Sequence, residues 1–306
     1  MNSSTEQMKT VGIVGLGLIG GSLGLDLRSH NFNVLGISHR QETCEKAKQI
    51  GAVDEYIVLS ENSEVDEVKT KLLQGVEIVF ICTPIDKITP TLKRLIPYLL
   101  PKTIVTDVGS VKTPIVQACS QLWDYFIGGH PMAGTARQGI EAAQNDLFVG
   151  AAYVLTPTET TPLVARERVE EIARSLGSII YTCMPEEHDR AVAWISHLPV
   201  MVSAALIDAC MSETDPKVFN LARQLASSGF RDTSRVGGGN PELGLMMAQY
   251  NQENLLRSLF SYRARLDRLI DTIKRENWDN LESILELTQR SRSEFLSSSH
   301  CSIINS

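Results

Sequence analysis

Residues 11–27, VGIVGLGLIGGSLGLDL, decide the fold of this chain. An apolar run leads into three glycines with G-x-G-x-x-G spacing, and an apolar-periodic stretch follows. A strand, a glycine turn and a helix in this order are the context in which that spacing binds a dinucleotide; a tight turn that binds nothing is the alternative. We therefore expect a pyrophosphate on the helix N-terminus, held by the backbone of Gly15, Gly17, Leu18, Ile19 and Gly20.

Outward from this stretch, residues 9–184 alternate between short β-rich runs and helical patterns. The runs are TVGIVG (10–15), NVLGI (33–37), VEIVFIC (76–82), TIVTDV (103–108), AAYVLT (151–156) and SIIYT (178–182). Alternating strands and helices indicate a parallel sheet, and nearly continuous apolar runs indicate strands buried on both faces. The sequence predicts an α/β fold with an N-terminal Rossmann-type, doubly wound domain over residues 9–184.

From residue 185 the strand patterns stop, and residues 185–297 are expected to form an all-α domain. Residues 185–210 read as one helix with acids in its first turn, which Pro199 should kink. Residues 241–276 read as a second, long helix with apolar residues at helical spacing: Leu255, Leu259, Leu266, Leu269 and Ile273. A core helix and a helix that packs on a partner both fit this pattern. We favour a homodimer, because so long a helix more often packs against a partner.

The composition excludes several classes of protein. Lys and Arg number 29 against 36 Asp and Glu, a net charge of −7, which argues against a nucleic-acid partner. The six cysteines show no CxxC pair, so we expect no metal and assign them as small buried hydrophobes in a reducing compartment. Residues 1–10 are polar, and Asp208 interrupts the most apolar run, so we expect a cytoplasmic protein without a membrane partner.

The residues after the second predicted strand bear on the choice of dinucleotide. An acidic residue there would bind the ribose 2′-hydroxyl of NAD, but this chain has Ser38, His39 and Arg40. Arg40 could pair with a 2′-phosphate, which favours NADP; the alternative is a solvated surface charge. Thr83 follows the strand at 76–82 and is expected to line the cofactor cleft, although Pro84 could simply end that strand.

Two polar residues follow predicted strands on the side where the cofactor is expected. Ser110 follows TIVTDV. His130 follows the short apolar run DYFIGG (124–129) and lies in GGHPMAG (128–134), where glycines and a proline restrict its backbone. Ser110 could instead cap a helix that starts near Val111. His130 could be a structural histidine, but a rigid backbone is what a catalytic base requires.

The helical domain contributes two more candidates, His197 in WISHLP (194–199) and Arg235 in GFRDTSRVGGGNPELG (229–244). Each has a structural alternative: His197 as a buried core histidine, and Arg235 in a surface pair with Asp232. His188, in a first helical turn, is expected to be solvated.

From about Val11 to about Leu296 the chain resembles the prephenate/arogenate dehydrogenases of tyrosine biosynthesis, and especially the cyanobacterial-type arogenate dehydrogenases. Six stretches in one order carry the resemblance: GLGLIGGSL (15–23), CTPI (82–85), TDVGSVK (106–112), GGHPMAGT (128–135), AWISHLPVMVSAAL (193–206) and SSGFRDTSRVGGGNPELG (227–244).

The resemblance implies oxidative decarboxylation of L-arogenate to L-tyrosine with hydride transfer to NADP. It also implies that His130 accepts the proton of the ring hydroxyl, that Ser110 orients it, that Arg235 binds a substrate carboxylate and that His197 helps to bind the substrate. A prephenate dehydrogenase that uses NAD(P) is the alternative. A β-hydroxyacid dehydrogenase is a second alternative, but it would be expected to use a lysine where this helix carries His197. A nucleotide sensor without activity is the non-enzymatic alternative.

Overall fold

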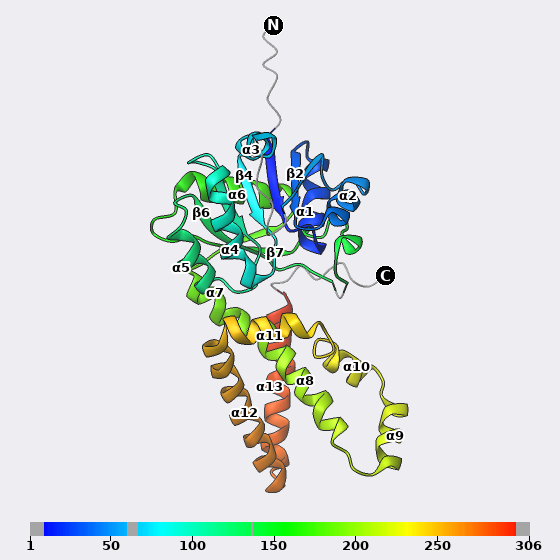
Figure 1. Cartoon of the computed structure of the whole chain (residues 1–306). Coiled ribbons are helices and arrows are strands. Elements are labelled where there is room, and N and C mark those ends of the chain that lie inside the picture. The colour runs from blue at the N-terminus through cyan, green and yellow to red at the C-terminus, as the bar shows by residue number, and fades with distance from the viewer. Residues whose placement is uncertain (1–8, 60–66, 136, 298–306) are drawn as a thin grey trace. The chain divides into compact units, whose positions relative to one another are not determined.

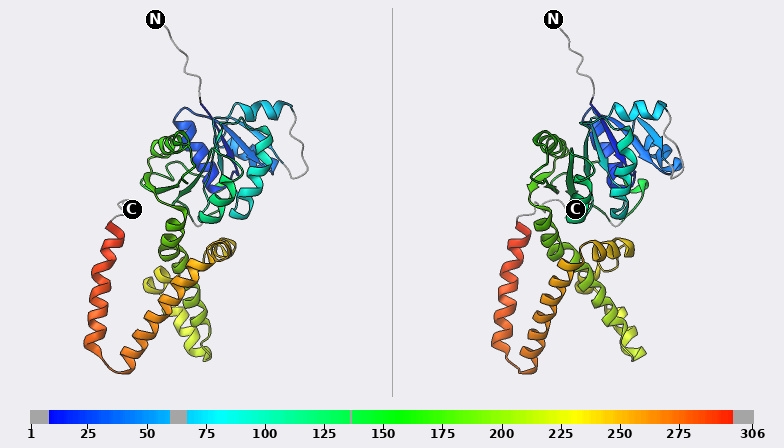
Figure 2. Two further views of the ribbon diagram at one scale, coloured as in Figure 1. Left: turned by 90° about the vertical axis from the view of Figure 1, so that its left-hand side faces the viewer. Right: turned by 60° about the vertical axis from the view of Figure 1, so that its left-hand side comes forward.

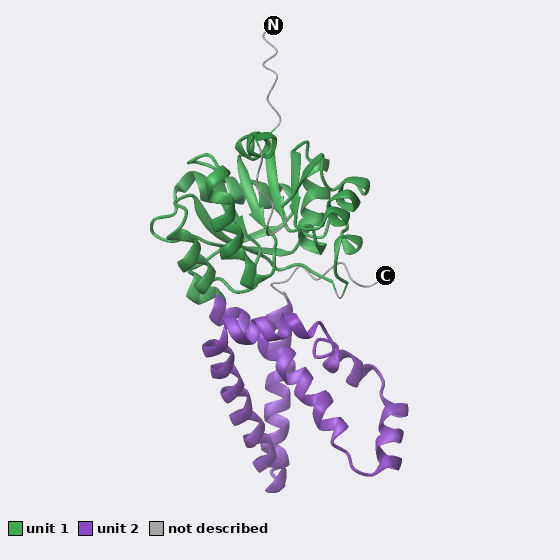
Figure 3. Cartoon of the chain, viewed as in Figure 1, with its two compact units in different colours: residues 1–188 green, residues 189–306 purple. Residues whose placement is uncertain are grey.

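The computed structural model describes residues 9–59, 67–135 and 137–297 (Figure 1). The chain divides into two compact units, residues 1–188 and 189–306 (Figure 3), and each is described by itself. His300 and Cys301 lie outside the described residues.

Unit 1 is built on one eight-stranded sheet with the strand order β3-β2-β1-β4-β5-β6-β7-β8. The strands are β1 (Thr10–Val14), β2 (Asn33–Ser38), β3 (Glu55–Val58), β4 (Ile78–Ile81), β5 (Ile104–Asp107), β6 (Phe126–Pro131), β7 (Ala152–Thr156) and β8 (Ile179–Thr182). The predicted α/β, doubly wound fold is confirmed. Strands β3 and β6 were not among the six β-rich runs singled out for the sheet.

One pairing departs from the predicted parallel sheet, because β6 and β7 are antiparallel. Among the described residues between them, Ile140–Ala142 form a 3-10 turn and none form a longer helix. These described residues therefore lack the crossover helix that normally joins parallel neighbours. The chain therefore reverses direction after β6, and β8 then pairs with β7 in parallel.

Seven helices accompany the sheet: α1 (Leu18–Ser29), α2 (Gln41–Gln49), α3 (Glu67–Gln74), α4 (Ile85–Leu95), α5 (Thr113–Ser120), α6 (Leu163–Ser175) and α7 (Pro185–Val192). Buried residues of α1 and α6 form one apolar cluster with the central strands. Helices α4 and α5 pack on each other and on β4 and β6. Right-handed crossovers that leave the sheet centre in opposite directions place α1 on one face and α4 and α5 on the other, and the reversed direction of β7 and β8 places α6 on the face of α1.

The strand order reverses between β1 and β4, and in such sheets ligands bind beyond the carboxyl ends of the strands at this point. The glycine turn follows β1, and Thr83 follows β4. Because β4, β5 and the start of β6 are parallel, the loop after β5 and the end of β6 lie along the same edge. The topology therefore collects the candidate residues of unit 1 at one edge.

Unit 2 is helical. Its elements are a π-helical turn at Ala193–His197 and the helices α8 (Leu198–Met211), α9 (Pro216–Leu225), α10 (Ser228–Ser234), α11 (Pro241–Tyr250), α12 (Gln252–Lys274) and α13 (Trp278–Ser297). The prediction of one helix over 241–276 is wrong, because Asn251 leaves the helical conformation with φ −124° and ψ 35° and separates α11 from α12. Helices α12 and α13 are joined by a short turn, near which Asn280 Nδ2 donates to Thr272 Oγ1 at 3.2 Å, and the left view of Figure 2 shows the two helices diverging from it.

The kink expected at Pro199 takes the form of the π-helical turn directly before α8. The helical run Pro185–Met211 continues through it and is, by length and composition alone, long and apolar enough to cross a membrane. No such run was expected from the sequence, because Asp208 interrupts its most apolar part. Only 28% of its most apolar 18-residue stretch is buried within the chain, so most of that stretch is not covered by other residues.

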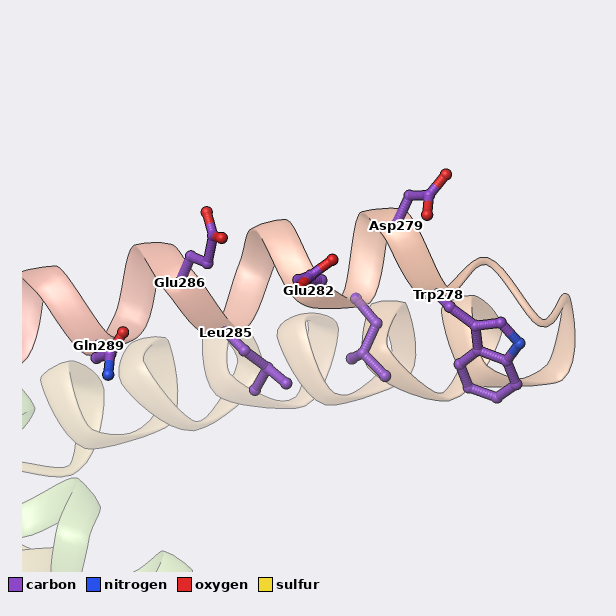
Figure 4. A pocket seen from close by; sticks show the side chains of 7 residues that line it. Trp278, Asp279, Glu282, Leu285, Glu286 and Gln289 are labelled. Atoms are coloured by element: carbon purple, nitrogen blue, oxygen red, sulfur yellow. The ribbon is translucent and has the colours of Figure 1, made fainter.

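Unit 2 leaves many large apolar side chains exposed. In the predicted stripe of α12, Leu255 is buried, whereas Leu266 and Ile273 are 44% and 50% exposed. Helix α13 is amphipathic beside a shallow hollow: Figure 4 shows Trp278 and Leu285 on the opposite side of the helix from Asp279 and Glu286. None of the predicted site residues lines this hollow.

Candidate functional site

The glycine turn after β1 has the geometry that its spacing predicts. Gly15 has φ +97°, and a Cβ there would lie 2.6 Å from the carbonyl oxygen of Cys82. A Cβ on Gly20 would lie 2.0 Å from the carbonyl oxygen of Gly15, so this glycine permits close packing of α1 on the turn. A Cβ on Gly17 would meet nothing within 4 Å. The backbone at Gly17 therefore faces open space, as the approach of a phosphate requires.

Two further features of this edge fit a dinucleotide. Helix α1 begins at Leu18 with no side-chain cap and no acidic residue in its first turn, so its positive end is not neutralised by its own first turn. The hydroxyl oxygen of Thr83 is buried and finds no hydrogen-bond partner among the described residues. A buried polar atom without a partner is uncommon, and a bound ligand is one way to satisfy it.

The residues at the end of β2 bear on whether the ribose of the cofactor carries a 2′-hydroxyl, as in NAD, or a 2′-phosphate, as in NADP. Ser38 is buried, and its Oγ accepts a hydrogen bond of 3.3 Å from the backbone N–H of Arg40. His39 and Arg40 are exposed, and Arg40 Nε donates to His39 Nε2 at 3.0 Å. This neighbouring pair of basic side chains, with no carboxylate in the turn, is suited to an anion.

Ser110 lies half-buried in the loop between β5 and α5. The alternative that it caps a helix starting near Val111 is wrong. Helix α5 starts at Thr113, and Lys112 occupies the N-cap position. The loop is shaped instead by Asp107, whose Oδ2 accepts a hydrogen bond of 2.8 Å from the backbone N–H of Gly109.

Lys112 and Asp107 form a buried ion pair that no pattern in the sequence predicts. Both side chains are completely buried, and Lys112 Nζ donates to Asp107 Oδ2. Lys112 Nζ also donates to the carbonyl oxygen of Gly129 at 2.6 Å, and the backbone N–H of Gly129 lies 3.3 Å from Asp107 Oδ1. The pair therefore connects the loop of Ser110 to the strand residue that precedes His130.

His130 lies within β6 rather than after it and pairs with Val154 of β7. Its Nδ1 lies 2.8 Å from Nε2 of His188, and the two rings meet edge to face at 73°. The prediction that His188 is solvated is wrong, because this side chain is only 3% exposed. Its place in a first helical turn suggested a solvated position, but α7 packs that turn against the end of β6.

The segment after β6 is hydrogen-bonded to helix α1, the helix that follows the glycine turn. Ser22 Oγ of α1 accepts a hydrogen bond of 3.0 Å from the backbone N–H of Gln144. Asp26 Oδ1 accepts one of 2.9 Å from the N–H of Asp146. Burial raises the pKa of the Asp26 carboxyl, and the hydrogen bond from Asp146 opposes that rise. Two hydrogen bonds therefore hold the segment that follows β6 against helix α1.

The described cysteines at this edge are unreactive. Burial raises the pKa of Cys119 to about 11 and that of Cys82 further, so both remain thiols at neutral pH. Among the described residues no disulfide and no group of metal-ligating side chains occurs.

In unit 2, His197 ends the π-helical turn and is 1% exposed. Its Nδ1 lies 3.2 Å from Nδ2 of Asn251, which also donates to the carbonyl oxygen of Asp189 at 2.8 Å. Asn251 is the residue that breaks the predicted long helix. The break therefore places an amide where it holds the backbone at Asp189 and the ring of His197.

Arg235 is exposed and follows α10. Its alternative assignment to a surface pair with Asp232 is wrong, because Asp232 pairs with Arg231 at 3.3 Å. The turn after Arg235 is attached to α8: Ser203 Oγ accepts from the N–H of Gly237 at 2.9 Å. A Cβ on Gly237 would lie 2.4 Å from the backbone nitrogen of Ala204, so a glycine is required there.

Comparison with known proteins assigns the two halves of the chain. Residues 23–182 match the family described as prephenate dehydrogenase, nucleotide-binding domain, and residues 184–287 match prephenate dehydrogenase, dimerization domain. The chain belongs to the prephenate dehydrogenase family. The match of residues 184–287 to a dimerization domain supports the expected homodimer.

Solved structures of whole relatives agree. The arogenate dehydrogenase of Synechocystis is 54% identical, with a TM-score of 0.82, and the match covers 94% of this chain and 99% of that one. The prephenate dehydrogenase of Aquifex aeolicus, solved with hydroxyphenyl propionate and NAD+, is 28% identical with a TM-score of 0.86, over 95% and 100%. The prephenate dehydrogenase of Bacillus subtilis is 29% identical over 90% of this chain and 73% of its own length.

A mutation at Lys112 tests the buried pair. Lys112→Met leaves the Asp107 carboxylate buried without its cation, so we expect the free energy of unfolding to fall by about 3–5 kcal/mol. Lys71→Met is the matched control, because the Lys71–Glu67 pair is exposed, and we expect a loss below about 1 kcal/mol. Urea unfolding at one protein concentration measures both. Equal losses for the two variants would show that the buried pair contributes no more to the free energy of unfolding than the exposed pair does.

Proposed function

We propose that this chain oxidatively decarboxylates L-arogenate to L-tyrosine with NADP+ as the hydride acceptor. The similarity to the arogenate dehydrogenase of Synechocystis over nearly the whole chain supports the substrate. In this proposal residues 9–184 bind the cofactor, and residues 185–297 bind the substrate and form the dimer contact. A cytoplasmic location, expected from the composition, stays a prediction.

The observation that carries the chemistry is the position of His130. It lies on strand β6, where Lys112 donates a hydrogen bond to the preceding residue, Gly129. The glycine turn and Thr83 lie at the same edge of the sheet. Bound NADP+ would supply the hydride acceptor. His130 takes the proton of the ring hydroxyl as that carbon loses its hydride, and the ring carboxylate then leaves as CO2 while the ring becomes aromatic. An imidazole suits this step because its ordinary pKa of about 6.5 lies near neutral pH.

The other candidates take supporting roles in the proposal. Ser110, from the loop that Asp107 shapes, orients the hydroxyl or the imidazole. Arg235 binds a substrate carboxylate, for which its planar fork of donors gives direction as well as charge. His197, held by Asn251, contributes a fixed donor or acceptor from unit 2.

The substrate and the cofactor are tested together by initial rates with arogenate and prephenate, each with NADP+ and NAD+. We expect arogenate with NADP+ to give the highest kcat/KM. The second candidate is a prephenate dehydrogenase, which the similarity to the Bacillus subtilis and Aquifex aeolicus enzymes favours. Higher kcat/KM with prephenate would establish that candidate. The β-hydroxyacid dehydrogenase alternative is disfavoured, because both halves of the chain match prephenate dehydrogenase domains.

Ser38→Asp tests the cofactor preference. A carboxylate at the end of β2 would repel a 2′-phosphate and accept a hydrogen bond from a ribose 2′-hydroxyl. We expect the ratio of kcat/KM for NADP+ to that for NAD+ to fall by at least about tenfold, the effect of about 1.4 kcal/mol. Ser38→Asn is the matched control of similar size without charge. An unchanged ratio in Ser38→Asp would place the 2′-position elsewhere.

His130→Asn tests the base. We expect kcat to fall by about 10²–10⁴-fold, the usual contribution of general acid–base catalysis. The dissociation constant for NADP+, measured by quenching of protein fluorescence, should stay within about threefold, a change below 1 kcal/mol. A kcat reduced less than threefold would remove His130 from the proton transfer and leave it a structural histidine.

A further inference from the structure

His188 has a hydrogen-bonding relation to His130 that neither the family assignment nor the proposed roles include. The two residues are 58 positions apart, yet His130 Nδ1 and His188 Nε2 are 2.8 Å apart. The rings are edge to face, with centroids 5.0 Å apart. In that arrangement a nitrogen of one ring points at a nitrogen of the other, so the contact is a hydrogen bond rather than a stack.

The surroundings of His188 hold it in place. Its side chain is buried, and its backbone N–H donates to the carbonyl oxygen of Met184 at 3.0 Å. The next residue, Asp189, is also buried, and its carbonyl oxygen accepts the hydrogen bond from Asn251. His188 therefore lies on a fixed backbone and presents one ring edge to His130.

We propose that His188 is a positioning residue that accepts a hydrogen bond from Nδ1–H of His130 and so makes Nε2 of His130 the base. The inference rests on the proposed role of His130. A neutral imidazole has one N–H and one lone pair. If Nδ1 of His130 donates to His188, the lone pair must be on Nε2, where it can accept the proton of the ring hydroxyl. His188 then carries its own proton on Nδ1.

The same hydrogen bond strengthens when the base is charged. After the proton transfer both nitrogens of His130 carry hydrogen, and Nδ1–H donates to His188 Nε2 as a charge-assisted bond. A carboxylate performs this role for the histidine of serine proteases, holding the required tautomer and stabilising the imidazolium. His188 would do so without adding a negative charge beside an anionic substrate.

Activity measurements test the positioning role with paired variants. His188→Leu removes the acceptor, and we expect kcat to fall by about 10–100-fold, the scale of the loss when the partner that orients a metal-ligating histidine is removed. The KM for arogenate should change less than about threefold, under 1 kcal/mol. His188→Gln restores an acceptor near the position of Nε2 and should recover most of the lost kcat. His30→Leu is the control, because His30 is exposed and far along the chain from these residues.

A spectroscopic measurement tests the tautomer without turnover. In protein labelled with ¹⁵N at its six histidines, the His130 signals are identified by their loss in His130→Asn. We expect wild-type His130 to carry its proton on Nδ1, and His188→Leu to shift it at least partly to Nε2. This readout and His188→Gln keep the test decisive if the leucine variant fails to fold.

The outcomes separate the inference from the proposed function. If His130→Asn is inactive while His188→Leu keeps kcat within threefold, or if wild-type His130 carries its proton on Nε2, the inference alone is wrong. If His130 carries its proton on Nδ1 but His130→Asn remains active, the hydrogen bond stands and the proposed base is wrong, so the inference is overturned with it.

Discussion

The buried ion pair between Lys112 and Asp107 is the interaction on which the sheet edge with the candidate site residues depends. Two charges without contact to water are stable only when each is matched by hydrogen bonds of good geometry. Here the partners are backbone groups, the N–H of Gly109 and both polar groups of Gly129. An apolar pair of equal volume could fill the space as well, but it would not fix these three groups. The charges therefore define the position of one loop relative to one strand.

That fixed position explains the glycines before His130. A Cβ on Gly128 would lie 2.3 Å from the hydroxyl oxygen of Thr156, and one on Gly129 would lie 2.7 Å from the carbonyl oxygen of Asp107. The strand can approach the ion pair only because neither residue has a side chain. The glycines in GGHPMAG thus serve close packing of β6 rather than a flexible loop, and the rigidity of His130 follows from that packing. The same logic applies at Gly15 and Gly20, where absent side chains bring α1 against the turn.

The sequence was sufficient for features that depend on local pattern. Alternating apolar runs and helices gave the doubly wound fold, and the spacing of Gly15, Gly17 and Gly20 gave the turn with its helix. It was insufficient for contacts between distant segments. His188 looked solvated because a first helical turn is usually exposed, and nothing local shows that β6 lies against it. Lys112 lies two residues before Pro114, at the start of a helix, and reads as an ordinary surface lysine; only its place in TDVGSVK marked it.

The break at Asn251 shows why helical periodicity could not predict the surroundings of His197. Apolar spacing continues from α11 into α12, so the pattern predicts one helix, and the non-helical φ and ψ of Asn251 have no counterpart in composition. At this break the side-chain amide of Asn251 donates to the carbonyl oxygen of Asp189 and lies 3.2 Å from Nδ1 of His197. The π-helical turn that ends at His197 is a second departure from regular helix on the same side chain. Turns of this kind are frequent at functional sites, and here Pro199 also disturbs the regular helix two residues later. Both irregularities meet at one buried histidine, and this adds to the motif in support of the proposed role of His197.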